Sequence, residues 1–267
     1  MTDDRLDISP ETVKALILSQ FPDWGGLEIT PVRPGGWDNR TFRLGTKMGI
    51  RMPSAERYAA NISKEATWLP KLAQALPYTV PKPLAVGTPG AGYPFQWMVF
   101  AWRDGATLDE GDPTLRQDAV LAEALAAALL TLQAVPTDGA PPAGAQNFHR
   151  GGDLGAYDTE TRDLIATLNE PQRQAAKTIW DRARASHWDA PGLWLHGDMS
   201  EGNILMQAGR FAGLLDFGLC GVGDPSSDLV PYWTIFEGAA RAAFRDRLDL
   251  DEATWERAAG GALWKAL

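Results

Sequence analysis

The sequence has little of what disulfide-stabilised and zinc-dependent proteins require. Among its 267 residues it contains one cysteine, Cys220, and three histidines. A single cysteine excludes an intramolecular disulfide framework and a cysteine-rich zinc site. So few histidines also argue against zinc catalysis.

Long apolar runs and positive charge are scarce as well. The longest apolar candidate, residues 121–135, is rich in alanine and too short to span a bilayer. The start, MTDDR, has no apolar region typical of a secretory signal. The net charge of −9 disfavours nucleic acid and anionic membranes and suits a cationic small substrate. We expect a cytoplasmic protein with no nucleic-acid or membrane partner.

The composition is that of a folded chain with a large core. Hydrophobic residues make up 45% of the sequence and charged residues 22%. This balance does not indicate wholesale disorder, and the length allows one two-lobed unit or two domains.

The sequence predicts a change of structure near residues 103–106. The first part has short alternating segments with glycine turns at 35–36 and 45–46, which favour strands, and two helical patterns. The predicted helices are 10–21, capped by Ser9, and 61–75, with a kink at Pro70. The predicted strands are 27–32, 41–44, 47–52, 80–86 and 95–102.

The second part favours helices around one group of strands. Its predicted helices are 119–135, 158–168, 171–187 and a helical region from 228 onward. A Pro/Gly-rich connection covers 136–155, and strands are predicted within 193–217. The final pattern, 251–267, runs to the last residue without a cap, which suggests that a C-terminal segment is missing.

One stretch carries recognisable chemistry. Residues 195–205 read LHGDMSEGNIL, with Asp198 followed five residues later by Asn203, and Asp216 opens an Asp-Phe-Gly triplet. Phosphoryl transfer by kinases needs one carboxylate to orient the acceptor hydroxyl, and an amide oxygen and a second carboxylate to hold Mg²⁺. An ordinary strand–turn–strand segment would also contain such residues, but the joint spacing favours the kinase interpretation.

The His-Gly-Asp start, in place of His-Arg-Asp, makes the chain resemble the aminoglycoside phosphotransferase family. The resemblance, together with the pattern of predicted elements, implies an α+β, protein-kinase-like two-lobed fold. Residues 1–103 would form a small β-rich nucleotide-binding lobe. Residues 104–267 would form a larger helical lobe for catalysis and substrate binding.

The resemblance implies a role for each motif residue. Asp198 would be the catalytic base, or at least the residue that aims the acceptor hydroxyl, and Asn203 and Asp216 would bind Mg²⁺. His196 is expected to fix the loop geometry. Asp228 is expected to cap a helix and to support the catalytic loop from below.

The sequence offers two candidates for the phosphate-binding cation. Arg51 stands where protein kinases place a lysine on the third strand, and Lys47 competes with it because both lie on one strand face. Glu65, on the following helix, is the expected partner of Arg51. A solvated surface pair would explain the same residues.

The nucleotide itself is expected near a glycine loop. Gly35, Gly36 and Asn39 match the family's nucleotide loop, although a plain hairpin turn would also explain the glycines. By resemblance alone, the adenine would bond to the main chain around Ala101 to Arg103. Glu201 and Glu237 would face a substrate ammonium group, or they could be ordinary solvated charges.

The expected activity is Mg²⁺-dependent transfer of the γ-phosphate of ATP or GTP to a hydroxyl of a small, cationic molecule. An aminoglycoside is the first choice, which would make the chain an antibiotic-resistance enzyme. Macrolides, choline or another amino alcohol, sugars and homoserine-like metabolites are the alternatives. A non-catalytic nucleotide-binding protein would share the fold. A protein kinase is disfavoured because no Ala-Pro-Glu segment follows Asp-Phe-Gly.

Overall fold

The computed structural model describes residues 4–33 and 36–267. The chain forms two compact units, Met1–Asp104 and Gly105–Leu267. Within the described residues, every helix is too short or too polar to cross a membrane.

The first unit is built on one antiparallel sheet. Its strand order is β1-β2-β3-β5-β4, and neighbouring strands all run in opposite directions. The strands are β1 (Ile29–Pro31), β2 (Asn39–Leu44), β3 (Met48–Pro53), β4 (Lys82–Gly87) and β5 (Trp97–Ala101). β3 is central, with β2 on one side and β5 on the other, so its side chains are almost all buried.

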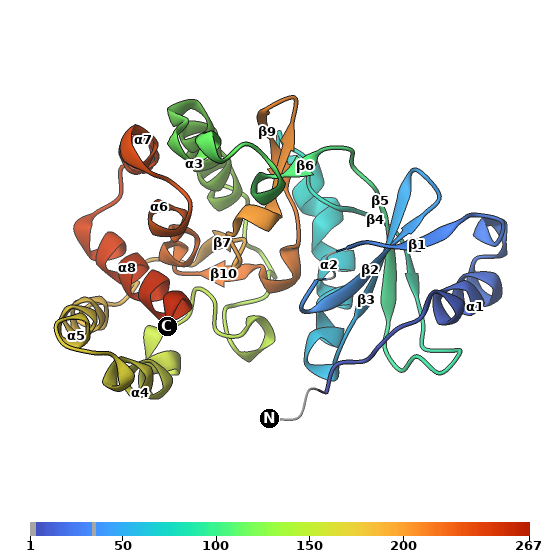
Figure 1. Cartoon of the computed structure of the whole chain (residues 1–267), viewed down its shortest axis with the longest axis horizontal. Helices are drawn as coiled ribbons and strands as arrows, with labels where there is room; N and C mark the ends of the chain where they lie inside the picture. Colours follow the sequence, from blue (N-terminus) through green and yellow to red (C-terminus); the bar gives the residue numbers. More distant parts are fainter. Residues whose placement is uncertain (1–3, 34–35) are drawn as a thin grey trace. The chain divides into compact units, whose positions relative to one another are not determined.

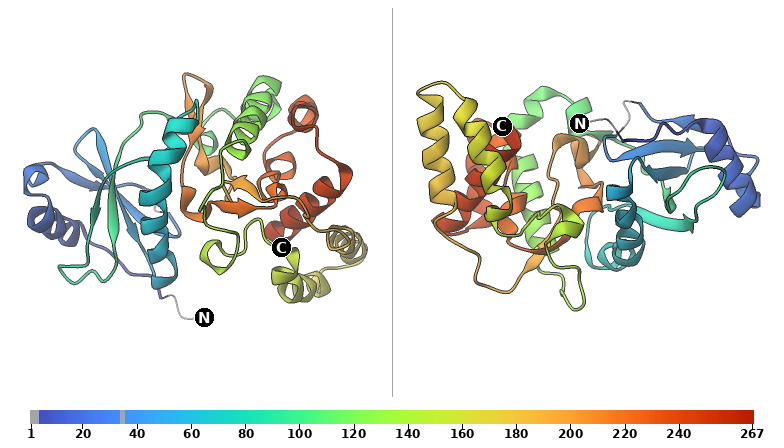
Figure 2. Two further views of the ribbon diagram at one scale, coloured as in Figure 1. Left: turned by 180° about the vertical axis from the view of Figure 1, so that it is seen from behind. Right: turned by 90° about the horizontal axis from the view of Figure 1, so that it is seen from below.

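Two helices cover this sheet. α1 (Pro10–Gln20) begins where the sequence predicts, because the Ser9 hydroxyl accepts a hydrogen bond from the Thr12 amide. Figures 1 and 2 show α1 and α2 (Glu56–Ala75) on opposite sides of the sheet. Val13, Leu16 and Ile17 of α1 enter the core against the strands.

Five short strands in two small sheets organise the second unit. β6 (Ala106–Thr107), β8 (Ile204–Gln207) and β9 (Arg210–Leu214) form one sheet in the order β6-β8-β9. β7 (Leu193–Leu195) pairs with β10 (Gly221–Gly223) in a second, two-stranded sheet. The segment between β7 and β8 is therefore a loop held at both ends by strands.

Helices form the rest of the second unit, and α5 packs on α8 while α3 packs on α7. Figure 1 shows α3, α6, α7 and α8 around the short strands. The helices are α3 (Ala119–Gln133), α4 (Asp158–Thr167), α5 (Gln172–Ala183), α6 (Pro231–Thr234), α7 (Gly238–Leu248) and α8 (Glu252–Ala266).

The predicted α+β division into a sheet-rich first part and a helical second part is confirmed. The boundaries differ in places. α2 begins at Glu56, five residues before the predicted start, and continues through Pro70. α5 ends at Ala183 rather than at residue 187. The motif region divides into three separate strands, because residues with positive φ interrupt the extended chain at Gly197, after β7, and at Ala208 and Gly209, between β8 and β9.

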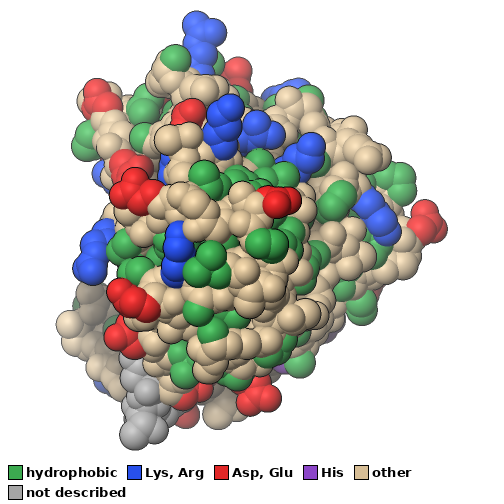
Figure 3. Space-filling view, turned by 90° about the vertical axis from the view of Figure 1, so that its right-hand side faces the viewer, with side chains coloured by type: hydrophobic (Ala, Val, Ile, Leu, Met, Phe, Trp, Pro, Cys, Tyr) green, Lys and Arg blue, Asp and Glu red, His purple; other side chains and the backbone are tan. Residues whose placement is uncertain are grey.

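Charge is mixed on one face of the molecule. In Figure 3, Lys and Arg side chains alternate with Asp and Glu side chains among hydrophobic and other groups. No broad field of a single sign is visible there among the described residues. Charges of both signs are therefore interspersed on this face.

Candidate active site

The loop after β7 has a tightly constrained backbone. Gly197 has φ +85°, and a Cβ atom at this position would lie 2.3 Å from the carbonyl oxygen of Leu219. Only glycine combines that conformation with so close an approach. The small residue in His-Gly-Asp thus lets the loop pass directly over the segment that follows Asp-Phe-Gly.

His196 joins the two halves of the motif from inside the core. Its side chain is fully buried, and its ring packs edge-on against Phe217 at a centroid distance of 4.6 Å. Nδ1 accepts from the Asp198 amide at 3.2 Å, so Nε2 carries the proton and donates to the Leu215 carbonyl at 2.7 Å. His196 therefore links the residues before Asp216 to the backbone of Asp198.

Asp228 supports the same loop from the other side. Its carboxylate accepts from the amides of His196 at 2.5 Å and Gly197 at 2.8 Å. Burial raises the pKa of Asp228, although these two backbone donors oppose the rise. The predicted helix cap at Asp228 is wrong. Asp228 ends the 3₁₀ turn Pro225–Asp228, which Asp224 caps, because its carboxylate is used by the catalytic loop.

Asp198 itself stays open to solvent. Its side chain is 33% exposed, and Oδ1 accepts from the ammonium of Lys265 at 2.9 Å. Oδ2 accepts from Asn203 Nδ2 at 3.1 Å, and the same amide nitrogen reaches the Asp198 carbonyl at 2.8 Å. The carboxylate is thus oriented by two neighbours while one part remains accessible.

Asn203 and Asp216 provide the oxygen atoms suited to a hard cation. Because the Asn203 amide nitrogen is turned to Asp198, its oxygen is the atom left for a ligand. The Leu215 amide donates to the Asn203 carbonyl at 2.8 Å, which ties the chain before Asp216 to Asn203. No group of three or more His, Cys, Asp or Glu residues in the described ranges could hold a metal. Two protein oxygens still fit Mg²⁺, which takes its other ligands from phosphates and water.

The first unit contains a buried cation with two partners. Arg51 Nη1 lies 3.0 Å from Glu65 Oε1, with the two side chains 9% and 0% exposed. The Asn39 amide, with its oxygen turned toward Arg51, accepts from Nε at 3.0 Å and Nη2 at 2.9 Å. The structure brings together three residues that the sequence assigned to the nucleotide, in a buried cluster instead of a solvated surface pair.

The other nucleotide candidates lie at the ends of strands of this sheet or in the adjoining loops. Lys47 is exposed in the turn before β3, and Gly36 lies before β2, whereas Gly35 falls outside the described residues. Ala101 ends β5 between β3 and β4, opposite Met48 and Lys82. Arg103 follows in an exposed loop. None of these joins the Arg51 cluster in the contacts described.

Both acids expected to bind a substrate ammonium already have partners. Glu201 forms a bidentate pair with Arg116, whose Nε and Nη2 lie 2.6 and 2.9 Å from the two carboxylate oxygens. Glu237 precedes α7, and its carboxylate accepts from Gln117 at 3.4 Å. Arg116 and Gln117 were missed at the sequence level because they lie about 85 to 120 residues away from their partners.

Lys265 was also missed. It lies in the last turn of α8, 67 residues from Asp198, and a lone lysine at a helix end gives no signal in the sequence. The assembled site can accept a proton at Asp198 and hold a hard cation at Asn203 and Asp216.

Comparisons with known proteins identify similar chains. The chain is 26% identical over 195 residues to the uncharacterized protein YcbJ of Bacillus subtilis (strain 168), covering 70% of this chain and 56% of that protein. It thus spans little more than half the length of that relative.

Solved structures share the fold. The GDP complex of wild-type aminoglycoside 2'-phosphotransferase-IIIa is 19% identical, with a TM-score of 0.79 over 96% of this chain and 88% of that one. Macrolide 2'-phosphotransferase MphH from Brachybacterium faecium is 18% identical, with a TM-score of 0.66 over 96% and 88%. The fold is therefore the kinase-like two-lobed fold that the motif predicts.

A family model covers most of the chain. The model described as "Phosphotransferase enzyme family" matches residues 28–260, from the start of the sheet to the last helix. This range includes the loop of Asp198 and Asn203, the Asp-Phe-Gly triplet and the Arg51 cluster. The chain therefore belongs to the phosphotransferase enzyme family.

Proposed function

We propose that this enzyme transfers the γ-phosphoryl group of ATP or GTP to a hydroxyl group of a small molecule, with Mg²⁺. One observation carries the proposal. Asp198 presents a partly exposed carboxylate from a loop whose backbone is fixed by His196, Asp228 and Gly197. A fixed loop with an open acid is suited to positioning an acceptor.

Asp198 would receive the acceptor hydroxyl as a hydrogen-bond donor and take its proton as the phosphoryl group arrives. In a loose transition state, positioning contributes more than early proton removal. Asn203 helps because it holds Oδ2 of Asp198 and so limits rotation of the carboxylate. His196 and Asp228 act on the backbone beneath Asp198 and do not touch the reactants.

Asn203 and Asp216 would hold Mg²⁺ through their side-chain oxygens. The bound ion would neutralise charge on the nucleotide phosphates. Asp216 is set in a left-handed conformation with φ 56°, and its carboxylate accepts from the Gly218 amide at 3.2 Å. This local hydrogen bond limits rotation of the Asp216 carboxylate after β9.

Arg51 is our candidate for the cation that meets the nucleotide phosphates. Glu65 and Asn39 fix its guanidinium and remove the rotamer freedom of a long side chain. Gly36 and the main chain from Ala101 to Arg103 are proposed to approach the phosphates and the adenine. Solved proteins of this fold include a GDP and kanamycin complex and a streptomycin and ATP complex, which supports a nucleotide donor.

The acceptor is a separate question. The names of similar structures suggest an aminoglycoside or a macrolide. In this chain Glu201 would have to leave Arg116 before it could bind a substrate ammonium. The pairing of Glu201 with Arg116 weakens the aminoglycoside assignment without affecting the reaction type.

The test measures Mg²⁺-dependent release of phosphate from ATP and GTP, with water as the acceptor, together with nucleotide affinity. Asp198→Asn should bind Mg²⁺–nucleotide normally and lose turnover by about 10²–10⁴-fold, the range for general-base contributions. Asp216→Ala should lose the dependence of nucleotide affinity on Mg²⁺. Unchanged Mg²⁺ dependence in Asp216→Ala would remove its ligand role, and normal turnover in Asp198→Asn would remove the proposed base.

A further inference from the structure

A small hollow in the second unit opens beside the loop that carries Asp198. Gly197 and Met199, the neighbours of Asp198 in the chain, line it, together with Arg150, Trp264 and Lys265. Its free volume is about 30 Å³, enough for water or for another compact group. The hollow can therefore receive a small polar group of a ligand.

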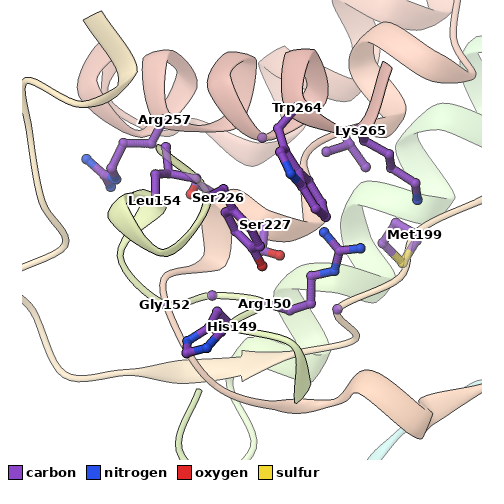
Figure 4. Close-up of a pocket in the computed structure, with 15 residues that line it drawn as sticks. His149, Arg150, Gly152, Leu154, Met199, Ser226, Ser227, Arg257, Trp264 and Lys265 are labelled. Atoms are coloured by element: carbon purple, nitrogen blue, oxygen red, sulfur yellow. The ribbon is translucent and has the colours of Figure 1, made fainter. Parts of the chain in front are cut away.

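The charged side chains that line the hollow are all basic. Figure 4 shows Arg150 pointing from its loop toward the ring of Trp264, while Lys265 extends from α8 on the side of Met199. Among the described residues, no aspartate or glutamate lines the hollow. Arg257 also lies there, but it is neutralised by buried Asp224 at 2.7 Å.

Arg150 is held in place without a carboxylate partner. Its guanidinium carbon lies 4.4 Å from the centre of the Trp264 ring. Tyr157 stacks against Trp264 at a centroid distance of 4.2 Å, and Glu160 accepts a hydrogen bond from the indole nitrogen of Trp264 at 3.1 Å. These two contacts hold the Trp264 ring in place beneath Arg150. Within the described ranges, Arg150 forms no ion pair, and its buried Nε has no hydrogen-bond partner.

The lining cations differ in their partners. Arg257 is paired with Asp224 and Lys265 with Asp198, whereas Arg150 has no acid among the lining residues. A positive charge held in a partly enclosed hollow favours an anionic ligand and repels an ammonium group. An anion bound here would also give Lys265 a second partner, which would release Oδ1 of Asp198 toward an acceptor hydroxyl.

We infer that the acceptor is a small alcohol that also carries an oxyanion group, either a carboxylate or a phosphate. Arg150 and Lys265 bind the oxyanion group while the hydroxyl faces Asp198. The inference rests on the proposed phosphotransferase activity and names the class of its acceptor. It differs from the aminoglycoside acceptor that the family resemblance favours and the overall negative charge supports, because the charged residues lining the hollow beside Asp198 are basic.

The experiment compares three acceptors of nearly equal size that differ in charge: 4-hydroxybutyrate, 1,4-butanediol and 4-amino-1-butanol. Glycerol 3-phosphate tests the phosphate form of the oxyanion, and kanamycin and a macrolide complete the panel. Acceptor-stimulated nucleotide turnover is measured above the rate with water, and the phosphoester is identified by ³¹P NMR. We expect the anionic alcohol to exceed the neutral one by about 10-fold, the size of one charge-assisted hydrogen bond, with the amine lowest.

Two variants assign the preference to the hollow. Arg150→Gln and Lys265→Gln should each raise the KM for the preferred anionic alcohol about 10-fold relative to the KM for 1,4-butanediol. Lys177→Gln, an exposed lysine of α5, is the matched control and should change neither KM.

The results separate this inference from the proposed function. Three results would overturn the inference alone, provided that the enzyme hydrolyses nucleotide. These are a preference for the amine or kanamycin, equal use of the three alcohols, and no use of either anionic alcohol. Loss of all Mg²⁺-dependent nucleotide turnover in the wild-type chain would overturn the proposed function as well. Preference for 4-hydroxybutyrate over glycerol 3-phosphate, or the reverse, identifies the oxyanion.

Discussion

Two ion pairs of almost the same length occupy very different surroundings in this enzyme. Arg51 and Glu65 lie 3.0 Å apart in the first unit, with 9% and 0% of their side chains exposed. Lys265 and Asp198 lie 2.9 Å apart in the second unit, with 32% and 33% exposed. The distance between the charges does not distinguish them, but their access to water does.

The difference in exposure separates a structural contact from an exchangeable one. Water cannot replace a partner in the buried pair, so removal of either charge leaves the other desolvated. Water or a substrate can replace Lys265 at Asp198, so the exposed pair contributes little to folding. The comparison predicts large stability effects at Glu65, intermediate effects beneath the catalytic loop, and small ones at Lys265.

The largest effect on stability is expected for Glu65→Ala. Removing this carboxylate takes away the ion-pair partner of the buried Arg51 guanidinium. Breaking a buried pair in this way costs about 3–5 kcal/mol of unfolding free energy. Urea unfolding measures it. Glu65→Gln should lose less, because its amide oxygen can still accept from Arg51.

Glu56→Ala is the matched control for Glu65→Ala. Glu56 is an exposed acid in the first turn of the same helix, so its removal should cost about 1 kcal/mol or less. Equal losses at Glu56 and Glu65 would contradict the comparison, because they would show that burial adds nothing to the Arg51–Glu65 contact.

The next effect concerns Asp228, which is as buried as Glu65 but receives backbone donors. Asp228→Ala leaves the amides of His196 and Gly197 without their acceptor. Two unsatisfied buried donors should cost about 2–4 kcal/mol, and turnover should fall because the loop loses its anchor. Asp246→Ala, an exposed acid of α7, should stay within about 0.5 kcal/mol of wild type. Turnover and unfolding free energy equal to those of the wild type in Asp228→Ala would contradict the supporting role of Asp228 beneath the loop.

The contribution of Asp228 to the unfolding free energy should depend on pH, because its pKa is raised in the folded chain. The folded chain holds the proton more tightly than the unfolded chain does. The stability from Asp228 is therefore complete below its ordinary pKa, about 3.9, and declines as the pH rises through the folded value. The gap in unfolding free energy between wild type and Asp228→Ala should shrink from pH 4 to pH 7. A gap that widens with pH would show that the two backbone donors outweigh burial.

The sequence predicts the parts of the site that are local in the chain. Asp198, Asn203 and Asp216 lie within one short stretch, and their spacing is set by two strands and the turn between them. The alternation of the first unit likewise predicts its strands to within a few residues. The motif spacing and the strands of the first unit can be predicted because residues close together in the sequence form them.

The distant basic partners of the acids in the site cannot be predicted in this way. Arg116 reaches Glu201 across 85 residues, and Lys265 reaches Asp198 across 67. Each is one basic residue among many, and only tertiary packing of α8 and of the segment before α3 brings it to its partner. Net charge is no guide to local charge for the same reason, since the sum of −9 coexists with a hollow beside Asp198 whose charged lining residues are basic.

The smallest effect is expected for the coupling between Asp198 and Lys265. A double-mutant cycle with Asp198→Asn and Lys265→Gln measures how much the pair contributes to unfolding free energy beyond its single residues. Because both side chains are about one-third exposed, the coupling should be about 0.5 kcal/mol or less and should fall further in high salt. A coupling above about 2 kcal/mol would place this pair in the class of Arg51 and Glu65. It would then make Lys265 a fixed part of the fold, since a contact that strong could not give way to an acceptor at Asp198.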